Sequence, residues 1–168
     1  MTLDLADPVD AADHRRGGGA RQLVVYGDFE CPYTAEAMRS IGRLVASGAV
    51  FDLVFRHFPL RTIHPHAEAA AAISEAAARQ GRFWEMHDLL FSDQRHLEDA
   101  DLRHDAERLS LDMTRVESDL VDPAIAARVE RDVDSGVRSG VDGTPSLFID
   151  GMRYRGPRDP GSLGGALT

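Results

Sequence analysis

The chain of 168 residues contains one cysteine, Cys31, within the sequence Asp28-Phe29-Glu30-Cys31-Pro32-Tyr33-Thr34. A thiol in this place could act as a nucleophile, because the segment follows an apolar run and opens a helix-like one, where a thiolate is favoured. No internal disulfide can form, since Thr34 stands where a redox pair would put its second cysteine. Whatever chemistry Cys31 performs, it performs as a single thiol.

The neighbours of Cys31 suggest how its thiolate would be held. We expect Cys31 to be the N-cap of a helix and Pro32 its first residue, so that N–H groups and the positive end of the helix dipole lie beside the sulfur. Both should lower the pKa of the thiol below its free value of about 8.5. Glu30 opposes this with the smaller effect of an exposed charge pair. Thr34 is expected to help through its backbone N–H and hydroxyl.

We therefore predict a moderately activated and accessible thiol at Cys31. The alternative is a buried, inert cysteine that acts as a small apolar residue, which is common for a lone intracellular cysteine. The junction between a strand and a helix that starts with proline is a poor place to bury a side chain. That argument favours reactivity but identifies only a reactive cysteine.

A second informative segment, Val141-Asp142-Gly143-Thr144-Pro145, stands directly before two short strand-like runs. X-Pro bonds are the only peptide bonds with an appreciable cis population, although most of them are trans in folded proteins. Taken alone, this segment is read as an ordinary turn.

The elements that must position these residues follow from periodicity. Residues 22–27 are nearly continuously apolar and predict a buried central strand, residues 32–47 a helix that ends at Gly48, and residues 50–58 a second strand. Strand, helix and strand in this order imply a parallel pair. The pair Asp150-Gly151 predicts a tight antiparallel hairpin over 145–154, and residues 158–168 a final helix.

Between the second strand and the hairpin the pattern is almost wholly helical. Asp112 and Asp122 have the character of N-caps, and the second precedes a proline. The expected helices cover residues 65–80, 82–92, 99–110, 113–121 and 124–139. Residues 1–21 are polar, lack periodicity and are interpreted as a loose leader.

Composition limits the classes of function. With 43% hydrophobic and 28% charged residues, the chain should fold as one soluble body. A net charge of −9 disfavours nucleic acid and anionic membrane surfaces as partners. No apolar run is long enough for a membrane span, and the first twenty residues do not look like a signal peptide. A single cysteine fits a reducing compartment, so we predict the cytoplasm.

Together, residues 28–33 and 141–151 resemble the DsbA-like branch of the thioredoxin superfamily. The stretches 55–60, 64–67, 81–87 and 139–141 are similar to that family as well, so the resemblance runs from about residue 20 to the end. It implies an α/β thioredoxin fold with an inserted all-helical domain. Residues 22–61 and 140–168 would form the discontinuous thioredoxin-fold domain, and residues 62–139 the helical insertion.

The resemblance also implies that the Thr144–Pro145 bond is cis, faces Cys31 and pairs with an extended substrate segment. It assigns Cys31 and Thr34 to the catalytic site, and Pro32, Tyr33, Thr144 and Pro145 to substrate binding. The chain departs from the usual Cys-x-x-Cys pattern at Thr34, so no resolving thiol is present. A mixed disulfide on Cys31 must then be released by a second substrate thiol or by a small thiol such as glutathione.

These expectations combine into a monothiol thiol–disulfide oxidoreductase without a cofactor, in which glutathione or another small thiol is a co-substrate. Its partners would be proteins or small molecules that carry thiols or disulfides. The alternative is a redox-inactive thioredoxin-fold binding or regulatory module, since similar DsbA-like domains occur attached to sodium/proton antiporters. A peroxide sensor that forms a sulfenic acid on Cys31 is a third hypothesis.

The histidines give no clear site. His64 and His66 are two residues apart and would not share a helix face, so we predict no metal site there. His57 ends a strand, and neither His57 nor His87 can be placed relative to the sulfur from the sequence. The oligomeric state is not indicated either.

Overall fold

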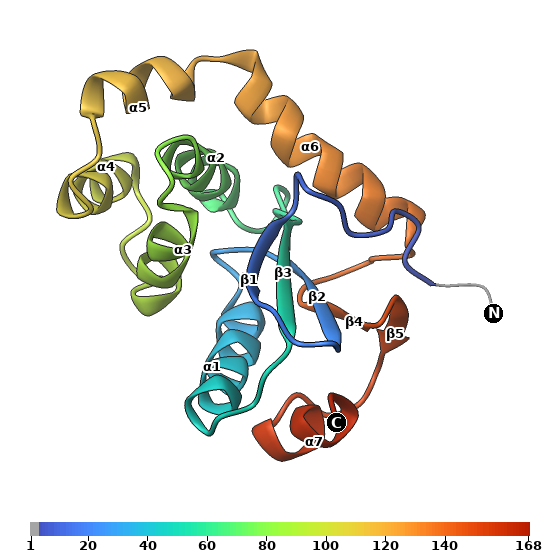
Figure 1. The fold of residues 1–168 in the computed structure, drawn as a ribbon. Helices are drawn as coiled ribbons and strands as arrows, with labels where there is room; N and C mark the ends of the chain where they lie inside the picture. Colours follow the sequence, from blue (N-terminus) through green and yellow to red (C-terminus); the bar gives the residue numbers. More distant parts are fainter. Residues whose placement is uncertain (1–3) are drawn as a thin grey trace.

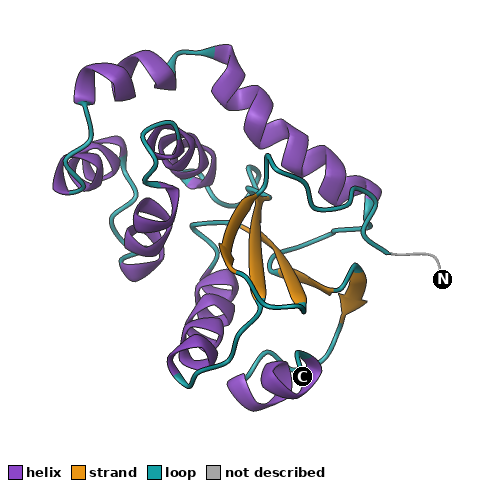
Figure 2. Cartoon of the chain, in the orientation of Figure 1, coloured by secondary structure: helices purple, strands orange, loops and turns teal. Residues whose placement is uncertain are grey.

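The computed structural model describes residues 4–168. Within this range a five-stranded sheet of order β1-β3-β2-β4-β5 is surrounded by seven helices (Figures 1 and 2). The elements in chain order are β1 (His14–Gly17), β2 (Gln22–Gly27), α1 (Pro32–Ala46), β3 (Asp52–His57), α2 (Ala67–Ala78), α3 (Phe83–Ser92), α4 (Asp99–Arg108), α5 (Met113–Leu120), α6 (Pro123–Arg138), β4 (Ser146–Ile149), β5 (Met152–Tyr154) and α7 (Pro160–Ala166).

Two pairs of strands in the sheet are those that the sequence predicts, the parallel pair and the hairpin. Strand β2 runs parallel to β3 and antiparallel to β4, and β4 turns into β5 through a tight antiparallel hairpin. The hairpin turn places Asp150 and Gly151 at φ values of 49° and 79°, and these left-handed values suit a type I′ turn. Because β2 leads into α1 and β4 follows Pro145, the sheet brings two distant segments to one edge.

Alternate residues of β2 bury opposite faces of the sheet. Leu23 and Val25 pack with residues of α1 and α7 on one side, whereas Val24 and Tyr26 pack with Phe148 and the region of α6 on the other. This alternation follows from the two-residue period of a strand. Figure 1 shows the resulting layers, with α1 and α7 below the sheet and α6 above it.

Helices α2 to α5 form a block beside the sheet. Their shared core includes Phe29, which stands two residues before Cys31, and Phe55 of β3. The helical insertion therefore supports the loop that carries the cysteine. Asp112 and Asp122 are the expected N-caps, since their carboxylates accept hydrogen bonds from the N–H groups of Arg115 and Ala124.

The N-terminal region corrects the interpretation as a loose leader. His14–Gly17 forms an edge strand antiparallel to β3, and Leu5 and Asp13 are buried. Residues 1–3 of the expected leader lie outside the described residues. The polar composition was misleading because this segment is held by buried charge as well as by apolar contacts.

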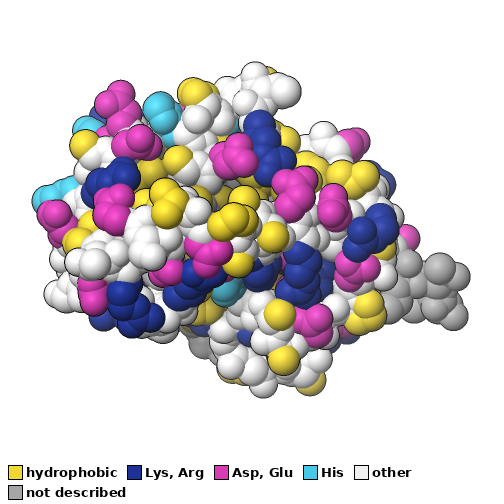
Figure 3. Space-filling view, turned by 90° about the horizontal axis from the view of Figure 1, so that it is seen from above, with side chains coloured by type: hydrophobic (Ala, Val, Ile, Leu, Met, Phe, Trp, Pro, Cys, Tyr) yellow, Lys and Arg dark blue, Asp and Glu magenta, His cyan; other side chains and the backbone are white. Residues whose placement is uncertain are grey.

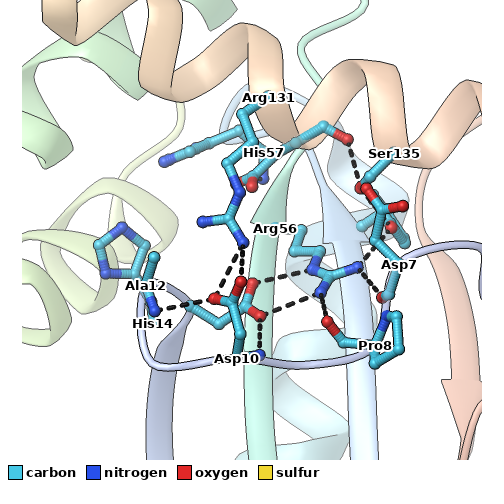
Figure 4. Close-up of polar contacts among 12 residues, drawn as sticks. Asp7, Pro8, Asp10, Ala12, His14, Arg56, His57, Arg131 and Ser135 are labelled. Atoms are coloured by element: carbon cyan, nitrogen blue, oxygen red, sulfur yellow. Dashed lines mark hydrogen bonds and ion pairs between the residues drawn. The ribbon is translucent and has the colours of Figure 1, made fainter.

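Arg56 is the anchor of the N-terminal segment (Figure 4). Its guanidinium is 1% exposed and donates to both carboxylate oxygens of Asp13, to the Tyr26 hydroxyl and to the carbonyls of Asp7 and Pro8. All five N–H groups of the side chain are thereby used. Burial alone would lower the pKa of Arg56, but the hydrogen bonds with Asp13 and Tyr26 raise it above its usual value.

The surface carries charges of both signs. Figure 3 shows arginine and acidic side chains interspersed over the face above α5 and α6, without a large area of one sign. Exposed ion pairs among the described residues include Arg61 with Glu130 and Arg103 with Glu117. No helix in residues 4–168 combines the length and the apolar character needed to cross a membrane.

Candidate functional site

Cys31 is the N-cap of α1, as the sequence predicts, with an extended backbone (φ −75°, ψ 120°) and Pro32 in the first turn. Its N–H donates to the Asp28 carbonyl at 3.1 Å, and its own carbonyl accepts from the Ala35 N–H at 3.1 Å. These bonds close the turn between β2 and the helix. The sulfur is thereby placed at the helix end where unpaired N–H groups gather.

A second part of the site comes from the segment before β4. The Thr144–Pro145 peptide bond is cis, and the Cys31 thiol donates to the Thr144 carbonyl at 3.5 Å. The pairing of Tyr26 with Ser146 sets this register. The Thr144 hydroxyl is buried and has no hydrogen-bond partner.

The exposure of the thiol differs from the sequence prediction. Cys31 is only 3% exposed, because the cis-proline loop lies against it, whereas the sequence predicted an accessible group. Pro32 is exposed and Tyr33 is 63% exposed. The structure therefore brings Cys31 together with Thr144 and Pro145 and buries the thiol. The Tyr33 side chain is exposed to solvent beside them.

Thr34 is fully buried one turn after Cys31. Its hydroxyl accepts from the Asp28 N–H at 3.4 Å, and no hydrogen bond joins Thr34 to the sulfur among residues 4–168. The strand end beside it has room for glycine only, because a Cβ on Gly27 would lie 2.5 Å from the Phe55 ring and 2.9 Å from the Thr34 methyl. The contribution of Thr34 to the thiolate thus stays a prediction.

Asp28 fixes the loop that carries Cys31. One oxygen of its buried carboxylate accepts from the Glu30 N–H, and the other from the Leu60 N–H and from His64 Nδ1, all at 2.7 to 2.8 Å. Glu30 in turn accepts from the His66 N–H at 2.7 Å. The carboxylate of Glu30 is therefore bound at the start of the insertion, and the His64 ring and the His66 backbone hold this loop.

Gln94 is a site residue that sequence reasoning missed. Its side-chain amide donates to the carbonyls of Phe29 and Cys31, at 2.7 and 3.0 Å. Gln94 lies in the loop after α3, so the helical insertion reaches directly into the turn before α1. A lone glutamine in a polar loop carries no signal in the sequence that could have identified this contact.

His57 and His87 lie in the aromatic interior around Phe29. His57 Nε2 contacts the Glu75 carboxylate at 2.7 Å, and the His87 ring packs edge-on against Phe29 with centroids 5.8 Å apart. His87 Nδ1 contacts Asp88, whereas its Nε2 is buried without a partner. Burial therefore lowers the pKa of His87 to about 4.

The lowered pKa of His87 predicts a loss of stability in acid. The unfolded chain binds this proton near the ordinary value of 6.5, and the folded chain only near 4. The folded state therefore loses about 3 kcal/mol as the pH falls through this window. We expect His87→Phe to remove most of that loss in urea unfolding between about pH 7 and pH 4. The exposed variant His104→Gln should keep the wild-type slope, and an unchanged slope in His87→Phe would contradict the prediction.

Comparison with known proteins places this site in a family. A family model described as thioredoxin matches residues 19–168. The chain belongs to the thioredoxin family. Its fold matches a thioredoxin-like oxidoreductase from Silicibacter pomeroyi with a TM-score of 0.83 at 24% identity, over 94% of this chain and 91% of the other. The thiol–disulfide exchange protein alpha-DsbA2 from Wolbachia pipientis gives a TM-score of 0.82 at 19% identity, over 94% and 87%.

These likenesses confirm the thioredoxin-like α/β fold of the DsbA-like type, in which helices α2 to α6 stand between β3 and β4. The chain also has a sequence relative that is a membrane transporter by name. The chain is 44% identical to the Na(+)/H(+) antiporter NhaA 3 of Salinispora tropica over 98% of its own length. It spans only about a quarter of that protein, at 26% of its length.

Proposed function

We propose that the protein catalyses thiol–disulfide exchange through Cys31 as a single nucleophile. The observation that carries the proposal is the place of the thiol, at the N-cap of α1 and 3.5 Å from the carbonyl that precedes the cis-proline. Two of its structural neighbours are an oxidoreductase and a thiol–disulfide exchange protein, and this likeness supports the proposal. The helix N-terminus stabilises negative charge on the sulfur that attacks.

The reaction needs two external partners. The Cys31 thiolate attacks the glutathione sulfur of a glutathionylated substrate, so that a new disulfide forms on Cys31 and the substrate leaves as a thiolate. A molecule of reduced glutathione then attacks the glutathione sulfur of that disulfide, which frees the Cys31 thiolate and yields oxidised glutathione. The external thiol is needed because Thr34 has no sulfur and cannot resolve the disulfide within the chain.

A substrate would bind beside the exposed residues that follow Cys31. Pro32 and Tyr33 stand at the surface, whereas Thr144 and Pro145 line the covered side of the thiol. An extended substrate segment would lie along the Thr144–Pro145 backbone, by the strand addition described for related grooves. A reducing compartment with millimolar small thiol, the cytoplasm, suits this cycle.

The proposal is tested by turnover of a glutathionylated peptide. We expect the wild-type chain to release the peptide thiol at a rate that rises with added reduced glutathione, and Cys31→Ser to give only the uncatalysed rate. The variant exchanges sulfur for oxygen at one atom, so its circular dichroism spectrum should match the wild type. Equal rates for the two proteins would overturn the proposal.

Gln94 is expected to position Cys31 for this reaction. In Gln94→Ala the carbonyls of Phe29 and Cys31 lose their shared donor, and the N-cap can shift. Since misplacing a reacting group by about 1 Å costs up to about a hundredfold, we expect the exchange rate to fall tenfold or more. The matched control is Gln80→Ala, because Gln80 also holds backbone groups, those of Asp112. A similar loss in both variants would assign Gln94 a merely structural role.

A second candidate function is a regulatory module, and the likeness to the Salinispora antiporter favours it. In this role the chain would act on sodium/proton exchange without turning over a disulfide. The test replaces the corresponding segment of that antiporter with this chain and measures exchange in vesicles. Regulation that persists in Cys31→Ser would support the module, and regulation that depends on the thiol would support redox chemistry.

A further inference from the structure

Outside the Cys31 site, two histidines and a glutamate from three elements meet at one point. His14 Nε2 of β1 and His57 Nε2 of β3 lie 2.5 and 2.7 Å from the same Oε1 atom of Glu75 on α2. One ligand atom from each residue lies within 4.8 Å of the others. The side chains of His14, His57 and Glu75 are 13%, 1% and 7% exposed. The cluster is enclosed, and it joins the sheet to the helical insertion.

We propose that His14, His57 and Glu75 bind a divalent transition metal ion, represented by zinc. Two imidazole nitrogens and one carboxylate oxygen are the protein ligands of many open zinc sites, in which a fourth position holds water. With zinc–ligand distances of about 2.1 Å, tetrahedral ligands stand roughly 3.4 Å apart. The two Nε2 atoms would therefore move away from Oε1 by less than about 1 Å, which side-chain rotation can supply.

The charges around Glu75 favour a cation at this point. Within residues 4–168 the ion-pair partners of Glu75 are His14 and His57, and no arginine reaches its carboxylate. Neutral imidazoles stabilise the Glu75 carboxylate by hydrogen bonds but bring no positive charge, which a divalent ion would supply. In the metal-bound form each neutral imidazole would present the Nε2 lone pair to the metal and carry its single proton on Nδ1.

Metal binding requires a change of tautomer at His57. Without metal, His57 Nε2 donates to Glu75 at 2.7 Å, and the ring proton would move to Nδ1, which has no hydrogen-bond partner of its own. The His14 ring is stacked on Phe83 with centroids 3.5 Å apart, and Phe83 also contacts His57. A surface cavity of about 340 Å³ is lined by His14, Phe83 and Trp84 among others, so it reaches one member of the cluster from solvent. Figure 4 shows His14 and His57 beside the Arg56 network.

Zinc titration of the full chain tests the site. Cys31→Ser is used as the background so that the thiol cannot bind metal, and the protein is first dialysed against chelator. We expect one zinc ion per chain, with a melting temperature that rises with zinc concentration by linkage. Because loss of an outer partner alone weakens metal sites about 10–100-fold, His14→Asn and Glu75→Gln should weaken binding at least tenfold. The exposed variant His104→Asn should bind as the background does.

Cobalt binding gives a second readout, because its visible absorption reports the ligands of the metal directly. The background protein should develop visible absorption with one equivalent of Co²⁺, and partly exposed His14→Asn, which leaves His57 and Glu75 in place, should not. Failure of the background protein to bind zinc more tightly than about 10 μM would overturn the proposal. Stoichiometric binding that is unchanged in His14→Asn would overturn it as well, because the metal would then lie elsewhere.

Discussion

Replacing Thr34 with cysteine is expected to convert the single-thiol site into a dithiol site that closes on itself. Thr34 is fully buried one turn after Cys31 on the same helix, and the related family carries its second cysteine at this position. The new thiol would attack the mixed disulfide on Cys31 within the molecule. An intramolecular attack replaces an encounter with free thiol, so release should be faster by at least about a hundredfold.

The measurement is the number of free thiols after oxidation, together with the rate at which a mixed disulfide on Cys31 decays without added thiol. Thr34→Cys should lose both thiols as a monomer. The control is Ser47→Cys, which places a second cysteine at the exposed C-terminal end of the same helix. This control should keep two titratable thiols. If Thr34→Cys still has two free thiols after oxidation, residues 31 and 34 are not placed so that a disulfide can form between them.

Removing the charge of Arg56 is expected to cause the largest loss of stability among the substitutions considered. Arg56→Met leaves the Asp13 carboxylate buried without its partner, and breaking a buried ion pair in this way costs about 3–5 kcal/mol. The same change also removes the donors that hold the carbonyls of Asp7 and Pro8. We therefore expect the segment before β1 to detach and the free energy of unfolding to fall.

Arg131→Met is the matched control, because Arg131 pairs with Asp10 of the same segment in an exposed position. An exposed pair contributes at most about 1 kcal/mol. Urea unfolding of both variants, with proteolysis of the N-terminal segment as a local readout, separates the two cases. A loss in Arg56→Met no greater than that in Arg131→Met would show that the buried network does not anchor the segment.

The parts of the fold that follow from the sequence are those with strong local patterns. The apolar run 22–27, the Cys31-Pro32 helix start and the Asp150-Gly151 turn each correspond to an observed element. The edge strand at His14–Gly17 was missed, because its stability comes from pairing with β3 and from a distant arginine rather than from its own residues.

The candidate site was also predicted only in part from the sequence. The sequence motif placed Cys31 and Pro145 in one site, and the structure brings the thiol against the cis-proline loop. It could not show that this loop covers the sulfur or that Gln94 holds its backbone, since both contacts join segments more than sixty residues apart. The sequence also gives no sign of the cluster of His14, His57 and Glu75, because these residues come from three separate elements and form no motif with a fixed spacing.

The most direct test of the account is the reaction of the folded, reduced chain with oxidised glutathione at neutral pH, followed by intact mass. The chain has one cysteine and no lysine, so an adduct of one glutathione reports Cys31. The account predicts this adduct on the folded protein, and its removal by added reduced glutathione. An adduct that forms only after unfolding in urea would contradict it, because the covered thiol would then be inert.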